Sequence, residues 1–318
     1  MTNVLKRRKT LAAVGIVLAV LLGPWLWSRF QSTANRIKVI AASDAITAAE
    51  KNSLRVACYN IAHGRGLAES NWDGGDAATR LSRLDEIAEL LKKLDVDVIV
   101  LNEVDFDASW SNRINQAEYL ADKAGYPFRV EERNLDFRVL HRTWRFGNAI
   151  LSRYPISNAK VIDLPSYAAI ETALAGKKRG VRCDVAVGKE PIRVFGLHLS
   201  HRSEDVREHS ARDVVKLVNE SQIPCIVMGD MNSTPPGFPG SSLASSGENA
   251  IQTFDRCEQL YRSEPPQPLN PSDFTYRSDQ PKSIIDWIFV SKTLNFQSLV
   301  VEGSQLSDHR PVVAEINW

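Results

Sequence analysis

Short apolar runs recur along the chain from Leu54 to Ile316, and most of them are rich in valine and isoleucine. Polar or turn-forming residues bound each run, which is the pattern of strands whose side chains are largely buried. The runs that predict strands are Leu54–Tyr59, Val96–Leu101, Asn148–Leu151, Val181–Val187, Ile192–Leu197, Cys225–Met228, Ile284–Val290 and Val312–Ile316. We therefore expect one domain that extends from about residue 51 to residue 318.

Two stretches between these runs repeat their apolar residues at helical spacing. Leu81–Leu94 places most of its aliphatic residues on one stripe, and Ser203–Glu220 is charged except for a narrow apolar stripe. Proline and glycine concentrate in Pro235–Gly240 and Pro265–Pro271, which predicts loops there. Because strands outnumber helices and several strands have short links, a two-sheet sandwich flanked by helices fits better than a doubly wound sheet.

The N-terminal region has a different pattern. A basic cluster, Lys6-Arg7-Arg8-Lys9, precedes a run from Leu11 to Trp27 that carries no charge. A helix over this run would rise about 25 Å at roughly 1.5 Å per residue, which is within the range of membrane-spanning segments. Trp25 and Trp27 fit an aromatic belt at the bilayer interface. The pattern predicts a cytoplasmic basic tail over residues 1–10 and a transmembrane anchor over residues 11–27.

The basic cluster is expected to stay in the cytoplasm, which places the rest of the chain outside it. Residues 28–50 are polar and alanine-rich, and we interpret them as a linker to the domain over residues 51–318. The alternative is a cleaved signal peptide, although the nearest small-x-small pattern, Ser32-Thr33-Ala34, lies well past the apolar run. The domain is therefore expected outside the cytoplasm, either held at the membrane by one helix or secreted after cleavage.

Charge is distributed unevenly along the chain. The net charge is +1, but residues 1–35 hold five basic residues and no acidic ones. The remainder has 34 basic and 38 acidic residues, a net charge of −4, which excludes a global positive field that would collect nucleic acid. No pair among Cys58, Cys183, Cys225 and Cys257 has zinc-site spacing, so we expect buried thiols, with a disulfide left open for an exported domain.

Polar side chains recur at the ends of the apolar runs, where rigid strands allow side chains to converge on one cleft. Carboxylates without cysteine partners are hard ligands that suit Mg²⁺ or Mn²⁺. Histidines beside carboxylates suit general-base and oxyanion roles. The set predicts a hydrolase that activates water and stabilises a phosphorane-like state. Its members are Asn60, Glu103, His198, Asp230, Asn232, Asp286, Asp308 and His309.

Six short motifs around these residues, in this order, resemble those of the endonuclease/exonuclease/phosphatase superfamily. The superfamily includes pancreatic deoxyribonuclease and neutral sphingomyelinase, and the resemblance spans about residues 54–318. The motifs are Tyr59-Asn60, Asn102-Glu103-Val104, Gly196-Leu197-His198-Leu199, Gly229-Asp230-Met231-Asn232, Ile285-Asp286-Trp287-Ile288 and Ser307-Asp308-His309-Arg310-Pro311. Two further segments, Asn60-Ile61-Ala62-His63-Gly64 and Gly147-Asn148-Ala149, are most similar to a group of bacterial predicted metal-dependent hydrolases.

The resemblance implies a deoxyribonuclease-I-like four-layer α/β sandwich, in which two packed mixed β-sheets are flanked by helices. It implies that Glu103 is the principal ligand of Mg²⁺ or Mn²⁺, with Asn60 and Asp308 nearby. Asp230 would orient or deprotonate the attacking water, and Asn232 would hold the phosphate. His198 would stabilise charge on a phosphoryl oxygen. His309, oriented by Asp286, would act as a general base or as a phosphate-contacting acid.

Substrate contacts are less well defined by the sequence. Asn148 and His201 are candidate substrate residues, and the basic and aromatic stretch Arg138–Phe146 is either a solvated loop or a surface for single strands or lipid head groups.

The first functional hypothesis is a metal-dependent phosphoesterase that hydrolyses a phosphodiester or phosphomonoester outside the cytoplasm, at a membrane that its N-terminal helix contacts. The expected partners are this phosphoester substrate, whether phospholipid, small diester or nucleic acid, and the membrane, with no protein partner. The alternatives are an exported nuclease acting on DNA or RNA and a non-catalytic binding module.

Overall fold

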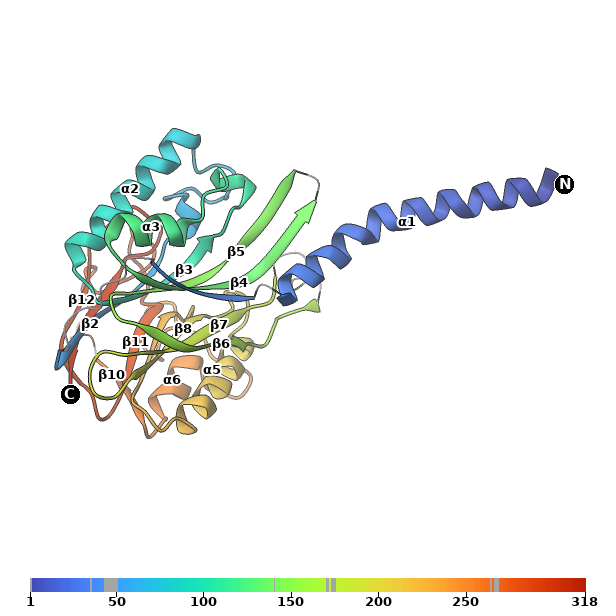
Figure 1. Cartoon of the computed structure of the whole chain (residues 1–318). Helices are drawn as coiled ribbons and strands as arrows, with labels where there is room; N and C mark the ends of the chain where they lie inside the picture. The colour runs from blue at the N-terminus through green and yellow to red at the C-terminus, as the bar shows by residue number, and fades with distance from the viewer. Residues whose placement is uncertain are drawn as a thin grey trace.

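Two β-sheets pack face to face in this protein (Figure 1). The computed structural model describes residues 2–34, 36–42, 51–139, 141–169, 172, 176–263, 265 and 269–318. The first sheet has the order β1-β4-β5-β3-β2-β13-β12, with bounds Ile37–Ala41, Phe128–Val139, Arg142–Ser152, Val98–Asp105, Ser53–Asn60, Val312–Asn317 and Asn295–Val301. The second has the order β10-β11-β9-β8-β7-β6, with bounds Leu260–Arg262, Asp286–Ser291, Cys225–Asp230, Ile192–His198, Arg179–Val185 and Ile156–Asp163.

Helices cover the outer face of each sheet. Aliphatic residues of α2 (Ala77–Leu94) and α3 (Gln116–Ala124) share one buried cluster with the first sheet. Those of α5 (Glu204–Asn219) and α6 (Ala250–Asp255) share another with the second sheet. The predicted four-layer α/β sandwich is therefore confirmed. Short 3₁₀ turns lie at Ala62–Gly64 and Ser109–Ser111.

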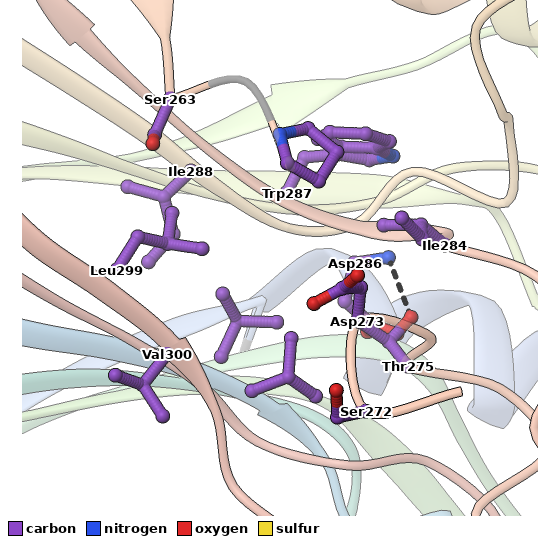
Figure 2. Close-up of a pocket in the computed structure, with 13 residues that line it drawn as sticks. Ser263, Ser272, Asp273, Thr275, Ile284, Asp286, Trp287, Ile288, Leu299 and Val300 are labelled. Carbon is purple, nitrogen blue, oxygen red and sulfur yellow. Dashed lines mark hydrogen bonds between the residues drawn. The ribbon is translucent and has the colours of Figure 1, made fainter. Parts of the chain in front are cut away.

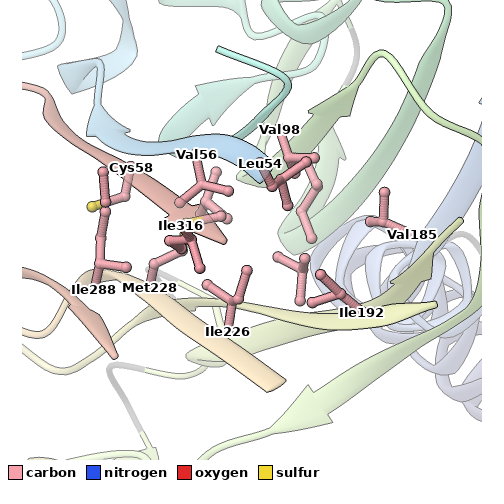
Figure 3. Close-up of a cluster of buried hydrophobic side chains, with 14 of the residues drawn as sticks. Leu54, Val56, Cys58, Val98, Val185, Ile192, Ile226, Met228, Ile288 and Ile316 are labelled. Atoms are coloured by element: carbon pink, nitrogen blue, oxygen red, sulfur yellow. The ribbon is translucent and has the colours of Figure 1, made fainter. Parts of the chain in front are cut away.

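The main core lies between the two sheets and consists of the inward-facing aliphatic side chains of both (Figure 3). Val56 and Val98 from the first sheet meet Ile226 and Met228 from the second in this cluster, and all four are fully buried. Each sheet is mixed, because the β2–β3 and β8–β9 pairs are parallel and the other pairs are antiparallel. All four cysteines are buried with free thiols.

The predicted strands agree with the structure where valine and isoleucine are dense, whereas five strands were missed. These are β1, β4, β6, β10 and β12. Four of them, β1, β6, β10 and β12, are the edge strands of the two sheets. One side of an edge strand has no neighbouring strand, and its side chains face water more often. β4 carries many charged residues that pair within the protein, so it does not show an apolar run. Apolar density predicts central strands better than edge strands for this reason.

The N-terminal segment forms one long helix, α1, over Thr2–Ala34. Residues Lys6–Trp27 of α1 are long and apolar enough to cross a membrane, and none of that stretch is buried inside the protein. The predicted linker over residues 28–50 needs a correction, because α1 continues to Ala34 and β1 pairs with β4 over Ile37–Ala41. Residues 43–50 of that linker, and part of the predicted Pro265–Pro271 loop, lie outside the described residues.

One of the two interpretations of the stretch Arg138–Phe146 was a solvated loop, and the structure corrects that interpretation. The stretch forms the outer part of the β4–β5 hairpin, in which Phe137 pairs with Trp144 and Arg138 with Thr143. Alternating charged and aromatic residues hid this strand pairing, because the aromatic rings pack on each other along the hairpin, 5.5 Å apart for Phe137 and Trp144, instead of in the core. The hairpin extends beyond the end of β3, where Asp105 pairs with Phe146.

Candidate active site

The polar residues that end the strands form one row in each sheet. In the first sheet Asn60 of β2 is level with Asn102 of β3. In the second sheet Asp230 of β9 lies between His198 of β8 and Asp286 of β11. Both rows lie at the same edge of the sandwich, because Nδ2 of Asn60 donates a hydrogen bond across the sheets to Oδ2 of Asp230, over 3.0 Å.

A β-bulge directs Glu103 into this edge. Asn102 and Glu103 on β3 oppose the single residue Asn148 on β5, and Glu103 adopts a left-handed backbone with φ of 52°. An extra residue in one strand changes which face the following side chain takes, and such backbone conformations in non-glycine residues concentrate at functional sites. The side chain of Glu103 remains 24% exposed, so it can reach a ligand in the cleft.

Gly229 sets the position of Asp230. Its φ is 137°, and a Cβ atom at this position would lie 2.1 Å from the carbonyl oxygen of Leu197 on the neighbouring strand. Glycine is therefore required for the close approach of β8 and β9. The backbone N–H of Asp230 donates to Oδ1 of Asn102 over 3.0 Å, so the two sheets also meet behind the site.

Asp286 and His309 form a buried carboxylate–histidine pair. Nδ1 of His309 lies 2.9 Å from Oδ2 of Asp286, and its Nε2 lies 3.7 Å from Oδ2 of Asp230. Burial lowers the pKa of His309, but the Asp286 and Asp230 carboxylates outweigh burial and raise it to about 10. Burial raises the pKa of Asp230 to about 7, against the opposing effect of His309. The imidazole of His309 is therefore cationic, and it lies beside the Asp230 carboxyl group, whose pKa is near neutrality.

A cavity of about 240 Å³ lies next to Asp286 (Figure 2). Thr275 contributes its hydroxyl to the lining, and Val300 contributes part of the apolar side. Oδ1 of Asp286 accepts no hydrogen bond from the described residues, whereas Thr275 Oγ1 accepts a hydrogen bond from the Asp286 backbone N–H over 3.2 Å.

His198 lies opposite, with Nε2 3.9 Å from Oε1 of Glu103 and 3.7 Å from Oδ2 of Asp230. Nζ of Lys178, just before β7, lies 3.3 Å from the same ring nitrogen. Burial and the Lys178 charge lower the pKa of His198 well below its usual value, so its imidazole is neutral at pH 7. The sequence interpretation missed Lys178, for which the only signal was the basic run Lys177-Lys178-Arg179 before a strand.

Arg65 bridges two of the predicted metal ligands. Its guanidinium donates to Oε2 of Glu103 over 3.0 Å and to Oδ2 of Asp308 over 2.9 Å, and the side chain is 12% exposed. Although burial acts to raise the pKa of Glu103, the positive charges of His63, Arg65 and Lys178 hold it well below its usual range. The sequence interpretation did not consider Arg65, whose only signal was its position directly after the Asn60–Gly64 motif.

His63 forms a second carboxylate–histidine pair beside Glu103. Nδ1 of His63 lies 2.7 Å from Oδ1 of Asp105, and its Nε2 lies 3.4 Å from Oε2 of Glu103. Trp110 donates its ring N–H to the other oxygen of Asp105 over 2.7 Å, which fixes the carboxylate. Burial lowers the pKa of His63, but the Asp105 charge gives a net increase. His63 therefore places a positive charge beside the Glu103 carboxylate, a contact that the quoted motif did not reveal.

The remaining candidates lie at different depths. Asn232, with φ of 50°, lies next to Asp230 and donates to the carbonyl of Leu199. His201 is exposed, and its charge is close enough to lower the pKa of His198. Asn148, a candidate substrate contact, is fully buried. Its amide oxygen accepts from Asn102, and its amide nitrogen donates to Glu132 and to the Arg179 carbonyl.

Glu132, behind Asn148, should make stability depend on pH. Burial raises the pKa of this carboxyl group to about 8, with Arg179 opposing the increase. The folded protein thus keeps a proton that the unfolded chain releases near pH 4.5, so the free energy of unfolding falls as pH rises through this interval. We expect Glu132→Gln, which cannot ionise, to stabilise the protein at pH 8 by on the order of 1–3 kcal/mol and to have little effect at pH 5.

Thermal unfolding of both full-length proteins in the same detergent at pH 5 and pH 8 measures this difference. An equal difference in unfolding temperature at the two pH values would contradict the Glu132 assignment.

The carboxylate oxygens of Glu103 and Asp308 are of the kind that a hard divalent cation prefers, and both of these groups bind the guanidinium of Arg65, which lies between them. The amide oxygen of Asn60 accepts one hydrogen bond, from the Ala62 N–H, and keeps a second lone pair. Atoms of Asp230, Asp286 and His309 also lie within 4.8 Å of one another. Because the neighbouring carboxylates raise the pKa of His309 to about 10, a cation that binds there would have to displace the proton from its ring.

Two facing mixed sheets with this carboxylate and histidine site at their shared edge define a hydrolase of the α/β sandwich class. A profile of the Endonuclease/Exonuclease/phosphatase family matches residues 57–309, which is most of the chain. The protein therefore belongs to this family, whose members are phosphoesterase or nuclease hydrolases. A search of curated protein sequences found no significant match.

Solved structures of the same fold have low sequence identity to the chain. An endonuclease/exonuclease/phosphatase from Beutenbergia cavernae has 19% identity and a TM-score of 0.62, covering 84% of this chain and 72% of its own. A Bacteroides thetaiotaomicron mannosyl-6-phosphatase has 17% identity and a TM-score of 0.61, covering 83% and 100%. The human Nocturnin catalytic domain with bound sulfate has 19% identity and a TM-score of 0.57, covering 89% and 97%. These likenesses establish the fold.

Proposed function

We propose that the protein is a divalent-metal-dependent phosphoesterase that hydrolyses a phosphodiester or phosphomonoester on the extracytoplasmic side of a membrane. The observation that carries this proposal is the convergence of residues from six separated motifs on one edge of the sandwich. Asn60, Asp230, Asp286 and His309 are linked there by contacts of 3.7 Å or less. His198 connects Asp230 to Glu103 through its ring nitrogen.

Asn60, Glu103 and Asp308 would hold Mg²⁺ or Mn²⁺, which when bound supplies Lewis-acid stabilisation of phosphoryl charge. The Asp230 carboxylate would accept a proton from water as the water oxygen bonds to phosphorus and the ester oxygen leaves. Its pKa of about 7 supports this role, because a general base works best when its pKa is near the working pH. Asn232 would donate a hydrogen bond to a phosphoryl oxygen.

The sequence left open whether His309 is a base or a phosphate-contacting acid. Its ring lies between two carboxylates, at 2.9 Å from Asp286 and 3.7 Å from Asp230, which stabilises the protonated form. We therefore favour His309 as a cationic donor to the phosphate. Neutral His198 with the adjacent Lys178 would stabilise charge on another phosphoryl oxygen.

An assay of the full-length protein in detergent tests the proposal. Bis-p-nitrophenyl phosphate, p-nitrophenyl phosphate, DNA, RNA and phospholipid would each be incubated with Mg²⁺ or Mn²⁺ and with EDTA. We expect metal-dependent release of product from at least one phosphoester. Hydrolysis of DNA or RNA alone would favour the nuclease alternative, and no hydrolysis of any member would favour a binding module.

Arg65 is expected to compete with the metal, because its guanidinium bonds to oxygens of both Glu103 and Asp308. Removal of this positive charge in Arg65→Ala should increase Mn²⁺ affinity by about tenfold or more, since like charges in a partly buried site repel by well over 1 kcal/mol. The same change should lower the unfolding temperature without metal, because two carboxylates then lose their cation. Calorimetric titration with Mn²⁺ and thermal unfolding measure both effects.

Arg83→Ala is the matched control, because Arg83 donates to the nearby Gly64 and Gly74 carbonyls and to no carboxylate of the site among the described residues. Unchanged or weaker Mn²⁺ binding by Arg65→Ala would show that Arg65 does not oppose the cation.

A further inference from the structure

The N-terminal strand β1 joins the first sheet at the same level as the row of active-site residues. Ile37, the first residue of β1, pairs with Glu132 of β4, and Glu132 pairs with Asn148 of β5. Asn148 lies opposite the bulge that contains Glu103. Three strand spacings of about 4.8 Å separate β1 from β3, so Ile37 lies about 14 Å along this row from the active-site strand.

The connection between this row and the apolar helix is short. Trp27 ends the membrane-spanning candidate, and α1 continues as a helix to Ala34, a rise of about 10 Å. Two residues then lead to Ile37, and the second, Arg36, is fixed to the domain. Its carbonyl accepts from the Arg133 N–H over 2.9 Å, and its guanidinium lies 3.5 Å from Asp163. A bilayer that holds α1 would therefore lie close to the active-site edge of the domain.

The β4–β5 hairpin lies on the same side of the molecule, and Figure 1 shows its tip on the side from which α1 leaves the domain. The hairpin surface consists of Trp72, Arg113, Arg138, Arg142 and Trp144. Arg113, Arg138 and Arg142 are exposed, and none of them forms an ion pair with a carboxylate among the described residues. Trp72 is 53% exposed.

A chain of side-chain contacts, partly buried, links the hairpin surface to the active site. The guanidinium of Arg142 lies over the ring of Trp72, whose ring contacts Trp110 at 5.9 Å. Trp110 contacts His63 at 6.1 Å, and His63 faces Glu103. Arginine attracts anionic head groups, and tryptophan favours the interface between head groups and acyl chains. The charge and aromatic content of the surface thus match the face of an anionic bilayer.

We propose that the hairpin surface rests on the anionic bilayer that holds α1, so that the cleft opens toward the head groups and the enzyme hydrolyses a lipid head-group phosphoester. This inference rests on the proposed function for its chemistry and on α1 as an anchor. In this arrangement α1 contributes to substrate selection. A soluble phosphoester can reach the active site without contacting the hairpin surface, whereas a lipid phosphoester lies in the membrane that the hairpin surface contacts.

Energy transfer in nanodiscs tests the orientation without any measurement of activity. A donor dye would be attached to full-length Arg142→Cys or Lys189→Cys in phosphatidylcholine and phosphatidylglycerol nanodiscs that contain a trace of acceptor lipid. The four native cysteines are buried, so they compete little for the dye. Lys189 is exposed in the β7–β8 connection, at the edge opposite His198. We expect at least twofold higher transfer efficiency from position 142, and equal or lower efficiency would overturn the proposal.

Variants that each lack two positive charges test whether the hairpin surface contributes to the binding of a lipid substrate. Arg138→Ser with Arg142→Ser should raise KM for a head-group phosphodiester in anionic vesicles at least fivefold and leave hydrolysis of bis-p-nitrophenyl phosphate unchanged. Lys189→Ser with Lys292→Ser is the control, since it removes two exposed charges at the opposite edge. A loss confined to DNA or RNA would show that the hairpin surface binds nucleic acid instead. Failure of the unaltered protein on every phosphoester would contradict the proposed function, whereas the energy-transfer result would stand independently.

Discussion

Glu103→Gln is expected to lower kcat by at least about a thousandfold, or roughly 4 kcal/mol in the activation free energy, while the protein stays folded. Glutamine keeps the shape of the side chain but removes the charge that a divalent cation needs. Glu103 also has no substitute, because the bulge in β3 directs this one side chain toward Asp308 and His198. Hydrolysis of the substrate found in the panel, at saturating Mg²⁺ or Mn²⁺, measures the effect.

Two measurements separate this effect from damage to the fold. Glu302→Gln is the matched control, since the Glu302 side chain pairs with Lys93 of α2 and not with a residue of the site, so its loss should leave kcat unchanged. Thermal unfolding should show a modest decrease for Glu103→Gln, because Arg65 and His63 lose a charged partner. A folded Glu103→Gln protein with normal activity would refute the assignment of Glu103 as the principal metal ligand.

His309→Ala is expected to lower kcat by about a hundredfold or more, the usual range for a positioned proton donor or cationic side chain. Asp286→Asn should have a smaller effect, because asparagine can still accept a hydrogen bond from His309 but no longer stabilises the imidazolium charge. Asp286→Asn combined with His309→Ala should be no worse than His309→Ala alone, since Asp286 acts on the reaction through His309. Steady-state kinetics of the three variants give this comparison.

His209→Ala is the control for loss of a histidine, because His209 lies exposed on α5 away from the cleft. Additive losses in the double variant would show that Asp286 contacts the reaction independently, through the oxygen that faces the neighbouring cavity.

The candidate site residues could be predicted from the sequence because each is a polar residue at or near the end of an apolar run. Asn60, His198, Asp230 and Asp286 each close or open a strand, and Glu103 follows the apolar run of β3; short motifs kept them recognisable. Local sequence also determined α2 and α5, whose spacing of apolar residues requires a helix against a sheet. These features depend on neighbours within a few residues.

Side-chain contacts between distant parts of the chain could not be predicted from local sequence. Arg65 follows a recognised motif, yet its role depends on Glu103 and Asp308, which lie 38 and 243 residues away. Asn148 matched a family motif and was a candidate substrate contact, but only the strand pairing shows that its amide bonds to Glu132 and Asn102. Lys178 meets His198 only because β7 and β8 pair.

The sequence by itself determined most of the central strands, the helices α2 and α5, the apolar N-terminal helix and the residues that we propose for the site, because each of these follows from local periodicity or a short motif. Only the tertiary structure decided the edge strands, the bulge at Glu103 and the charge partners of the site, because these depend on pairing between distant segments. The same holds for the entry of the chain at the active-site row, since β1 joins the sheet through backbone hydrogen bonds, which leave little trace in side-chain composition.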